Sequence, residues 1–317
     1  MLQAKAQRKM KSAFRRIGIL WLVLALCLAC APALAGESVT FKKATFDSDA
    51  EYIDLGDVTV ASGDMDRFYA FLAKFPKLKK VDMFATRIGR LRIEAMQERF
   101  PNIQFGMTMV LAKHVIRTDA TAFSCLHGYE TFEHSSQDLS ILKNCTNLYA
   151  LDLGHNLIDD LDLLYSLPKL RVLILACNNI TDITPVASLK DLEYLEIFKN
   201  DIHDVTPLAE LPHLVDLNIT SNRIQDITPL KNVKTLQRLW INNCNAYSKT
   251  VPVPPDQVEV LREALPDARV DEFSRGTEGG WREGNHYDTI FRIFNGQDGY
   301  EPFDDVHYDS YAYEFEK

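Results

Sequence analysis

The feature that most constrains the fold is a repeat of 22 residues marked by a recurring leucine. The leucines are Leu148, Leu170, Leu192, Leu214 and Leu236. Four complete copies of the surrounding frame follow one another, beginning with LYALDLGHNLIDDLDLLYSLPK, and a fifth opens as LQRLWINNCN and then changes. Self-similarity at this period is typical of stacked coils, each of which is one structural unit. The repeat therefore predicts an array of coils, and it identifies no ligand.

Each copy carries two apolar residues separated by one position, such as Leu173 and Leu175. A period of two indicates a β-strand with one buried face. Because every coil supplies one such strand from the same place, the sequence predicts a parallel sheet along one wall of the array.

An asparagine follows the strand in each complete copy, where the chain must turn inward. A buried amide satisfies backbone groups that an apolar side chain would leave unpaired. The fifth copy has a cysteine there, which the repeat pattern allows. The predicted structural residues of this turn are Asn156, Asn178, Asn200, Asn222 and Cys244.

The second half of the coil contains Thr184-Pro185 and its equivalents at 206–207 and 228–229. Threonine is expected to cap a helical turn there, with proline at its first position. A coil this short has room for one turn, which favours a 3₁₀ helix. An aspartate precedes each turn, at Asp160, Asp182, Asp204 and Asp226. Stacked carboxylates suit Ca²⁺, and aspartate is also an ordinary turn acceptor. We favour the turn and predict no metal.

These residues resemble the 22-residue leucine-rich repeats of bacterial surface proteins of the internalin kind, over about a third of the chain. The resemblance implies an α/β solenoid, a curved array with a parallel concave β-sheet and short 3₁₀ or α turns on the convex side. It also implies an interaction scaffold rather than an enzyme, and no cofactor.

Residues 1–35 are predicted to be a signal peptide. A basic start precedes the apolar run Ile17 to Ala29, and Ala33-Leu34-Ala35 fits a cleavage site. The run is short for a stable membrane span. Lipid attachment at Cys30 and an uncleaved anchor remain alternatives. All three predict export, with the protein secreted or at the cell surface.

Without residues 1–35 the chain keeps 44 acidic residues and loses six of its 35 basic ones, so its net charge becomes about −15. Such a charge argues against nucleic acid or an anionic membrane as partner. We expect a monomer that binds a protein or a glycan. No G-x-S-x-G, H-E-x-x-H or P-loop motif occurs in the sequence.

Outside the regular repeats, the sequence predicts longer coils. Arg67 to Met83 and Arg92 to Phe105 each suggest a helix, a Phe-Pro stop and a strand, and Asp256 to Val270 repeats this order with Leu-Pro. Gly36 to about Val60 is expected to cap the array. The expected segments are 1–35 (signal peptide), 36–147 (cap and divergent repeats), 148–245 (regular repeats), 246–275 (closing repeat) and 276–317 (C-terminal cap or acidic aromatic tail).

The C-terminal segment contains a predicted linker over 275–285. An amphipathic helix is expected to follow it and to pack on the last coil, through Tyr287, Ile290, Phe291, Ile293 and Phe294. The remainder is rich in acids and aromatics. It suggests either a cap or an independent recognition element.

Two hypotheses concern cysteine. A Cys125–Cys145 disulfide would fix the start of the array in an exported protein, and buried free thiols are the alternative. Cys177 shares its frame position with His155 and Lys199, which would lower its pKa and activate it. No oxyanion hole accompanies it, so we predict no catalytic residue.

The outward positions of the predicted sheet form columns across adjacent coils, which lie about 5 Å apart. Aromatic and apolar residues with a charged rim are typical of a binding surface. The predicted ligand-binding residues of the concave face are Val172, Ile174, Tyr194, Glu196, Phe198, Asp216, Asn218, Arg238 and Trp240. Coverage by the C-terminal segment is one alternative. A structural component of the envelope, docked through its tail, is another.

Overall fold

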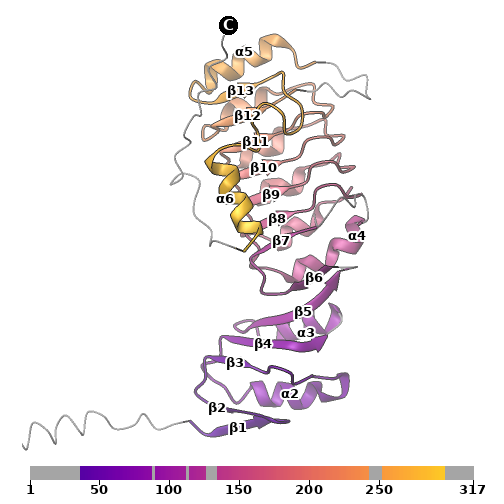
Figure 1. Cartoon of the computed structure of the whole chain (residues 1–317), viewed down its shortest axis with the longest axis vertical. Coiled ribbons are helices and arrows are strands. Elements are labelled where there is room, and N and C mark those ends of the chain that lie inside the picture. The colour runs from indigo at the N-terminus through magenta and orange to yellow at the C-terminus, as the bar shows by residue number, and fades with distance from the viewer. Residues whose placement is uncertain (1–35, 88–89, 112–113, 126–133, 243–251, 297–317) are drawn as a thin grey trace, which may run out of the picture.

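The computed structural model describes residues 36–87, 90–111, 114–125, 134–242 and 252–296. The predicted signal peptide, Cys30 and Cys244 lie outside these residues. The chain forms an elongated stack of strands, with most helices and helical turns along one side and the last described helix on the other (Figure 1). None of the helices described is long and apolar enough to cross a membrane.

The regular repeats form a parallel sheet of seven strands in the order β13-β12-β11-β10-β9-β8-β7. Leu195 pairs with Leu173 on one side and with Leu217 on the other, so equivalent residues of successive coils lie side by side. This sheet confirms the predicted solenoid. Its strands are β7 (Ala122–Ser124), β8 (Ala150–Asp152), β9 (Val172–Ile174), β10 (Tyr194–Glu196), β11 (Asp216–Asn218), β12 (Arg238–Trp240) and β13 (Arg269–Asp271).

Each regular coil returns through a five-residue 3₁₀ turn, as predicted. The turns are η2 (Ser140–Asn144), η3 (Asp162–Ser166), η4 (Thr184–Ser188), η5 (Thr206–Glu210) and η6 (Thr228–Asn232), with the short helix α4 (Ser136–Leu139) before η2. The predicted capping role of threonine is wrong. Thr184 is the first helical residue, and its N–H donates to Oδ1 of Asp182 at 2.8 Å.

The aspartate column therefore consists of turn acceptors, and the same bond recurs at Asp204 and Asp226. Among the described residues, no group of histidine, cysteine and acidic side chains is arranged to hold a metal ion.

The side chain of each repeat asparagine forms hydrogen bonds with the backbone of the preceding coil and of its own coil. The side chain of Asn200 accepts from the N–H of Ile180 at 3.1 Å and donates to the carbonyls of Leu175 and Ile197, both at 3.0 Å. Asn178 and Asn222 make equivalent bonds. The residue before each of these asparagines has a positive φ, for example Cys177 at 57°. The amide side chain thus forms the hydrogen bonds that the backbone groups at this bend cannot form within their own coil.

The N-terminal part forms a separate sheet of four strands, ordered β3-β4-β5-β6. Its helix–stop–strand units match the predicted order. Its elements are the β1 (Ser38–Phe41) and β2 (Ala44–Asp47) hairpin, β3 (Tyr52–Asp54), η1 (Ser62–Asp64), α2 (Met65–Leu72), β4 (Lys80–Arg87), α3 (Arg90–Arg99), β5 (Gln104–Leu111) and β6 (His114–Arg117).

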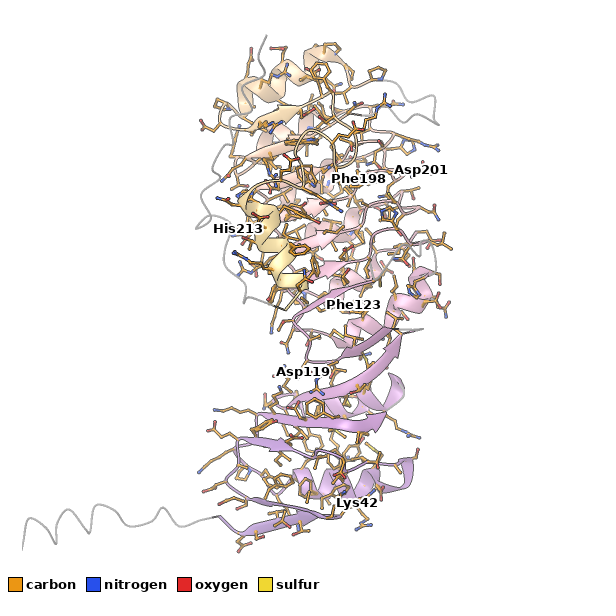
Figure 2. The ribbon with its side chains drawn as sticks, viewed as in Figure 1. Lys42, Asp119, Phe123, Phe198, Asp201 and His213 are labelled. Atoms are coloured by element: carbon orange, nitrogen blue, oxygen red, sulfur yellow. The ribbon has the colours of Figure 1, made fainter. Side chains whose placement is uncertain are left out.

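Strand β6 departs from the expected array because it pairs antiparallel with β5. The reversal separates the two sheets at a junction marked by Asp119 and Phe123 (Figure 2). One hydrophobic core nevertheless runs through both parts, from Val39 to Leu265. The N-terminal end of that core is closed by phenylalanine rings, with Phe41 centred 5.2 Å from Phe68 and 5.3 Å from Phe71.

The closing coil contains α5 (Pro255–Ala264) and β13, in the predicted order. Helix α6 (Asn285–Phe294) then crosses beside strands β7 to β10, opposite the 3₁₀ turns (Figure 1). The expectation that this helix packs on the last coil is wrong. Its buried residues are His286, Thr289, Ile290 and Ile293, while Phe291 is 57% exposed.

Cys125 and Cys145 are free thiols, so the structure contains no bond between them, and both side chains are buried. Burial raises the pKa of each thiol to about 12, which keeps both protonated at neutral pH. The alternative of buried free thiols holds for these two residues.

Candidate functional site

The strand register brings the predicted concave residues together. Tyr194 lies between Val172 and Asp216, and Glu196 lies between Ile174 and Asn218. On the next strand, Asp216 pairs with Arg238 and Asn218 with Trp240. The nine predicted residues therefore occupy one continuous face of strands β9 to β12 and the turn that follows β10.

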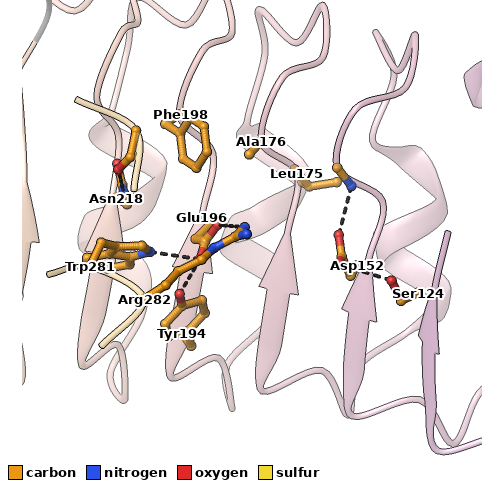
Figure 3. A network of polar contacts seen from close by, with 12 residues as sticks. Ser124, Asp152, Leu175, Ala176, Tyr194, Glu196, Phe198, Asn218, Trp281 and Arg282 are labelled. Carbon is orange, nitrogen blue, oxygen red and sulfur yellow. Dashed lines mark hydrogen bonds and ion pairs between the residues drawn. The ribbon is translucent and has the colours of Figure 1, made fainter. Parts of the chain in front are cut away.

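The expected exposure of this face is wrong, because all nine side chains are buried. The most accessible, Phe198, is only 8% exposed. The covering segment is residues 273–294, which we call the C-terminal strap. It leaves the end of β13, runs back over the concave face and ends in α6 (Figure 1). Two of its residues, Trp281 and Arg282, point toward Glu196 (Figure 3).

Glu196 is the centre of one polar contact between sheet and strap (Figure 3). Its Oε1 accepts from the indole nitrogen of Trp281 at 2.8 Å, and its Oε2 accepts from Nη2 of Arg282 at 2.7 Å. The hydroxyl of Tyr194 also donates to Glu196. Burial tends to lower the pKa of Arg282, but the hydrogen bond and charge of Glu196 outweigh it and raise that pKa. Arg282 therefore stays protonated at neutral pH.

Asp216 forms a second polar contact. Arg238 donates to both of its oxygens, through Nε at 2.9 Å and through Nη2, and His286 Nδ1 lies 2.7 Å from Oδ2. Burial alone would raise the pKa of Asp216, but Arg238 and His286 hold it below its usual value. Asp216 is thus a buried anion that contacts both Arg238 of the sheet and His286 of the strap.

Other concave side chains contact the main chain of the strap. Asn218 Nδ2 donates to the carbonyl of Gly276 at 2.6 Å, and Trp240 Nε1 donates to that of Glu278 at 3.2 Å. Arg238 Nη1 donates to the carbonyl of Trp281 at 2.9 Å. Main-chain carbonyls occur in every polypeptide, so these three bonds recognise a backbone rather than particular side chains.

Aromatic rings fill the space between the polar contacts. The ring of Trp281 is centred 5.0 Å from that of Trp240 and 5.4 Å from that of Tyr194, and the guanidinium of Arg238 lies 4.7 Å from its centre. Farther along, Ile290 and Ile293 of α6 join Val172 and Ile174 in a second buried apolar cluster. The strap is therefore held by rings, charges and aliphatic side chains together.

Asp152 lies on the same face, one strand beyond Ile174. Its carboxylate accepts from the N–H of Gly154 at 3.0 Å and from the hydroxyl of Ser124 at 3.1 Å. Burial, assisted by the charge of Glu196, raises its pKa from 3.8 to about 6. Among the residues that the structure describes, Asp152 has no ion-pair partner comparable to that of Glu196 or Asp216, and its raised pKa reflects the cost of its burial.

The hypothesis of an activated Cys177 thiol is wrong. Burial raises the pKa of Cys177, and the smaller effect of Lys199 does not reverse this. Burial also lowers the pKa of His155. The three residues do share one frame position, but that position provides a backbone bend rather than a nucleophile.

Trp281, Arg282 and His286 were not among the predicted site residues, since 275–285 was expected to be a linker and His286 to begin the cap or tail that follows it. One signal was present in the sequence. The concave columns contain Glu196 and Asp216, and residues 282 to 286 contain a cation, Arg282, and an imidazole, His286, that complement them. No repeat or periodicity links the two sets, so the pattern did not reveal the contact.

A model of the family described as leucine-rich repeats in two copies matches residues 168–210 and 190–232. Residues 168–232 are leucine-rich repeats. A search of curated protein sequences finds no significant match.

Several solved leucine-rich-repeat structures resemble the chain. An internalin C2 of Listeria monocytogenes is 22% identical, with a TM-score of 0.37, over 63% of this chain and 73% of that one. The Leptospira interrogans protein LIC12759 is 20% identical, with a TM-score of 0.41, over 64% and 56%. An internalin F of Listeria monocytogenes is 21% identical, with a TM-score of 0.35, over 64% and 76%. At these values we transfer no functional residue from them.

Proposed function

We propose that this chain is an extracellular binding scaffold whose concave face holds a polypeptide segment. Leucine-rich-repeat proteins are generally protein-interaction scaffolds. The basic and apolar start of the sequence, followed by Ala33-Leu34-Ala35, supports a location outside the cytoplasm. The ligand-binding residues in this proposal are the nine concave residues, from Val172 to Trp240, that were predicted from the repeat.

One observation carries the proposal: the concave face binds a polypeptide already, in the form of the C-terminal strap. Side chains of Asn218, Arg238 and Trp240 donate to three carbonyls of that segment, at Gly276, Trp281 and Glu278 respectively. Several main-chain carbonyls close together in one segment are a property of a polypeptide and not of a glycan. These contacts therefore favour a protein ligand over a glycan.

The experiment begins with the full chain, so that the protein folds with its strap in place. A site for a specific protease is inserted between Gly279 and Gly280, in the largely exposed stretch before Trp281. After cleavage, residues 280–317 are held without a covalent link. A fluorescent synthetic peptide of residues 280–296 is then added in excess, and its anisotropy is followed.

We expect the labelled peptide to replace the cleaved segment and to bind saturably. A peptide with Arg282→Ala should bind at least about 10-fold more weakly, because it leaves Glu196 without its cation. A control peptide with Asp288→Asn, changed at an exposed position of α6, should bind like the parent. The proposal is wrong if the cleaved segment never exchanges, or if the rest of the protein unfolds once it leaves.

A further inference from the structure

Two apolar surfaces of the protein, the N-terminal end of the core and the concave face, are covered by different chemistry. The N-terminal end is closed by packed rings, among them Phe41, Phe68 and Phe71. The concave face is covered by the strap, and there Glu196, Asp216 and Arg238 are each 0% exposed. Both coverings exclude water, but only the second buries charge.

Burying a charge has a large desolvation cost, and well-packed apolar residues cover a surface equally well without it. The rings at the N-terminal end illustrate that cheaper solution within the same protein. Buried charges do, however, discriminate between segments, because a wrong segment leaves them unpaired. The buried charges of the concave face therefore indicate that this face binds one kind of segment selectively. Simple exclusion of water would not need them.

The strap shows which occupant the face selects. An indole at Trp281 lies between the rings of Tyr194 and Trp240, and its N–H reaches Glu196. The next residue, Arg282, supplies the cation for the same carboxylate. Four residues later, in the first turn of α6, an imidazole reaches Asp216. The apolar side of the helix then covers Val172 and Ile174.

Building on the proposed function, we propose that the partner of the concave face is a polypeptide with the same chemistry as the strap. Its segment has a large aromatic residue followed directly by arginine, and then an amphipathic helix with a histidine in its first turn. The strap occupies the site within the chain and competes with that partner.

The geometry of the strap supports competition. Residues 281–294 of the strap are joined to the closing coil through residues 274–280, where Gly276, Gly279 and Gly280 have positive φ values of 53°, 68° and 81°. A tether this short gives an effective concentration on the order of millimolar, so an external segment binds the intact chain more weakly than it binds a freed face. Weakening the strap should therefore strengthen binding of an external segment.

The test uses the uncut full chain in three forms: wild type, Arg282→Ala and Arg275→Ala. Arg275 is an exposed cation of the same segment, which makes it the matched control. The probe is the fluorescent peptide of residues 280–296. We expect Arg282→Ala to bind it at least about 10-fold more tightly than wild type does, because its own strap has lost the ion pair. Arg275→Ala should bind it like wild type.

Specificity is tested with peptides altered at Trp281→Ala or Arg282→Ala, added to the Arg282→Ala chain. Neither should bind well. Circular dichroism verifies folding, and if Arg282→Ala does not fold, Arg282→Lys replaces it, with an intermediate gain in affinity expected.

The outcomes separate the two proposals. Competition is wrong if the cleaved chain binds the peptide while wild type and Arg282→Ala bind it equally well or not at all. The aromatic–arginine preference is wrong if the altered peptides bind as well as the parent. If the cleaved chain itself does not bind the peptide, the proposed function fails and this inference fails with it.

Discussion

The indole nitrogen of Trp281 donates a 2.8 Å hydrogen bond to Oε1 of Glu196, a residue 85 positions earlier in the chain. Through this contact the last part of the chain joins the middle of the repeat array. It turns the concave face, ordinarily the open side of such an array, into a buried interface within one protein.

Removing the charge of Glu196 should destabilise that interface. In Glu196→Gln the guanidinium of Arg282 keeps its place but loses its counter-ion, at a cost of about 3 kcal/mol. We expect a lower midpoint in urea denaturation and faster proteolysis within 274–280. The control is Glu283→Gln, at an exposed position one residue beyond Arg282, which should match wild type. Equal loss in both variants would contradict a role specific to Glu196.

Asp152 should make the stability of the protein fall as pH rises. Its folded pKa of about 6 exceeds the ordinary 3.8, so the folded state holds this proton more tightly than the unfolded state does. The resulting stability is fully present below about pH 4 and is lost between about pH 4 and 6, and the difference corresponds to about 3 kcal/mol.

Asp152→Asn keeps an acceptor for the N–H of Gly154 and removes the titration. The variant should therefore be more stable than wild type above pH 6, by up to about 3 kcal/mol, and similar to it at pH 4. Urea denaturation at four pH values between 4 and 7.5 measures this. Asp191→Asn, at an exposed position, should show no such pH-dependent gain. A gain for Asp152→Asn that does not change with pH would be evidence against burial of a charged carboxylate.

Removal of one amide from the stacked repeat asparagines should lower the stability of the protein. Asn200→Ala leaves the N–H of Ile180 and the carbonyls of Leu175 and Ile197 without their side-chain partner, at a cost of about 3 kcal/mol or more. Asn179→Ala is the matched control, since Asn179 is exposed and lies in the coil before. Thermal unfolding of the two variants compares them. Similar midpoints would mean that water replaces the amide without penalty.

The aspartates before the 3₁₀ turns should behave as turn acceptors. Asp204→Ala removes the acceptor for the N–H of Thr206 and should cost about 1 kcal/mol, whereas Asp204→Asn should retain most of the stability. Denaturation with and without added Ca²⁺ completes the test. If Ca²⁺ stabilises wild type but not Asp204→Asn, the column binds a metal and the assignment to turns is wrong.

The regular coils were predictable because their information is local and repeated. Leu173 and Leu175 reveal a strand by their spacing alone, and the same spacing recurs in every coil. The helix before β4 and the strand β13 followed from similar signals, a stop such as Phe75-Pro76 or Leu265-Pro266 between a helical and an extended stretch.

The reversed strand β6 and the strap depend on contacts that are not local. Arg117 of β6 lies in a stretch that reads equally well as one more parallel strand, and only pairing with β5 sets its direction. The nine concave residues were located correctly on one face by their columns. Their burial was not predictable from those columns, because it depends on Trp281 and Arg282, which belong to no repeat.

Hydrogen–deuterium exchange of the wild-type protein tests the central claim most directly. If the strap is an occupant of a binding face, amides of residues 281–294 should exchange through an opening that costs less free energy than global unfolding. The amides of strands β9 to β12 should stay protected during that opening. Exchange of both regions together, only by global unfolding, would show that the strap is an inseparable part of the core and would contradict the account.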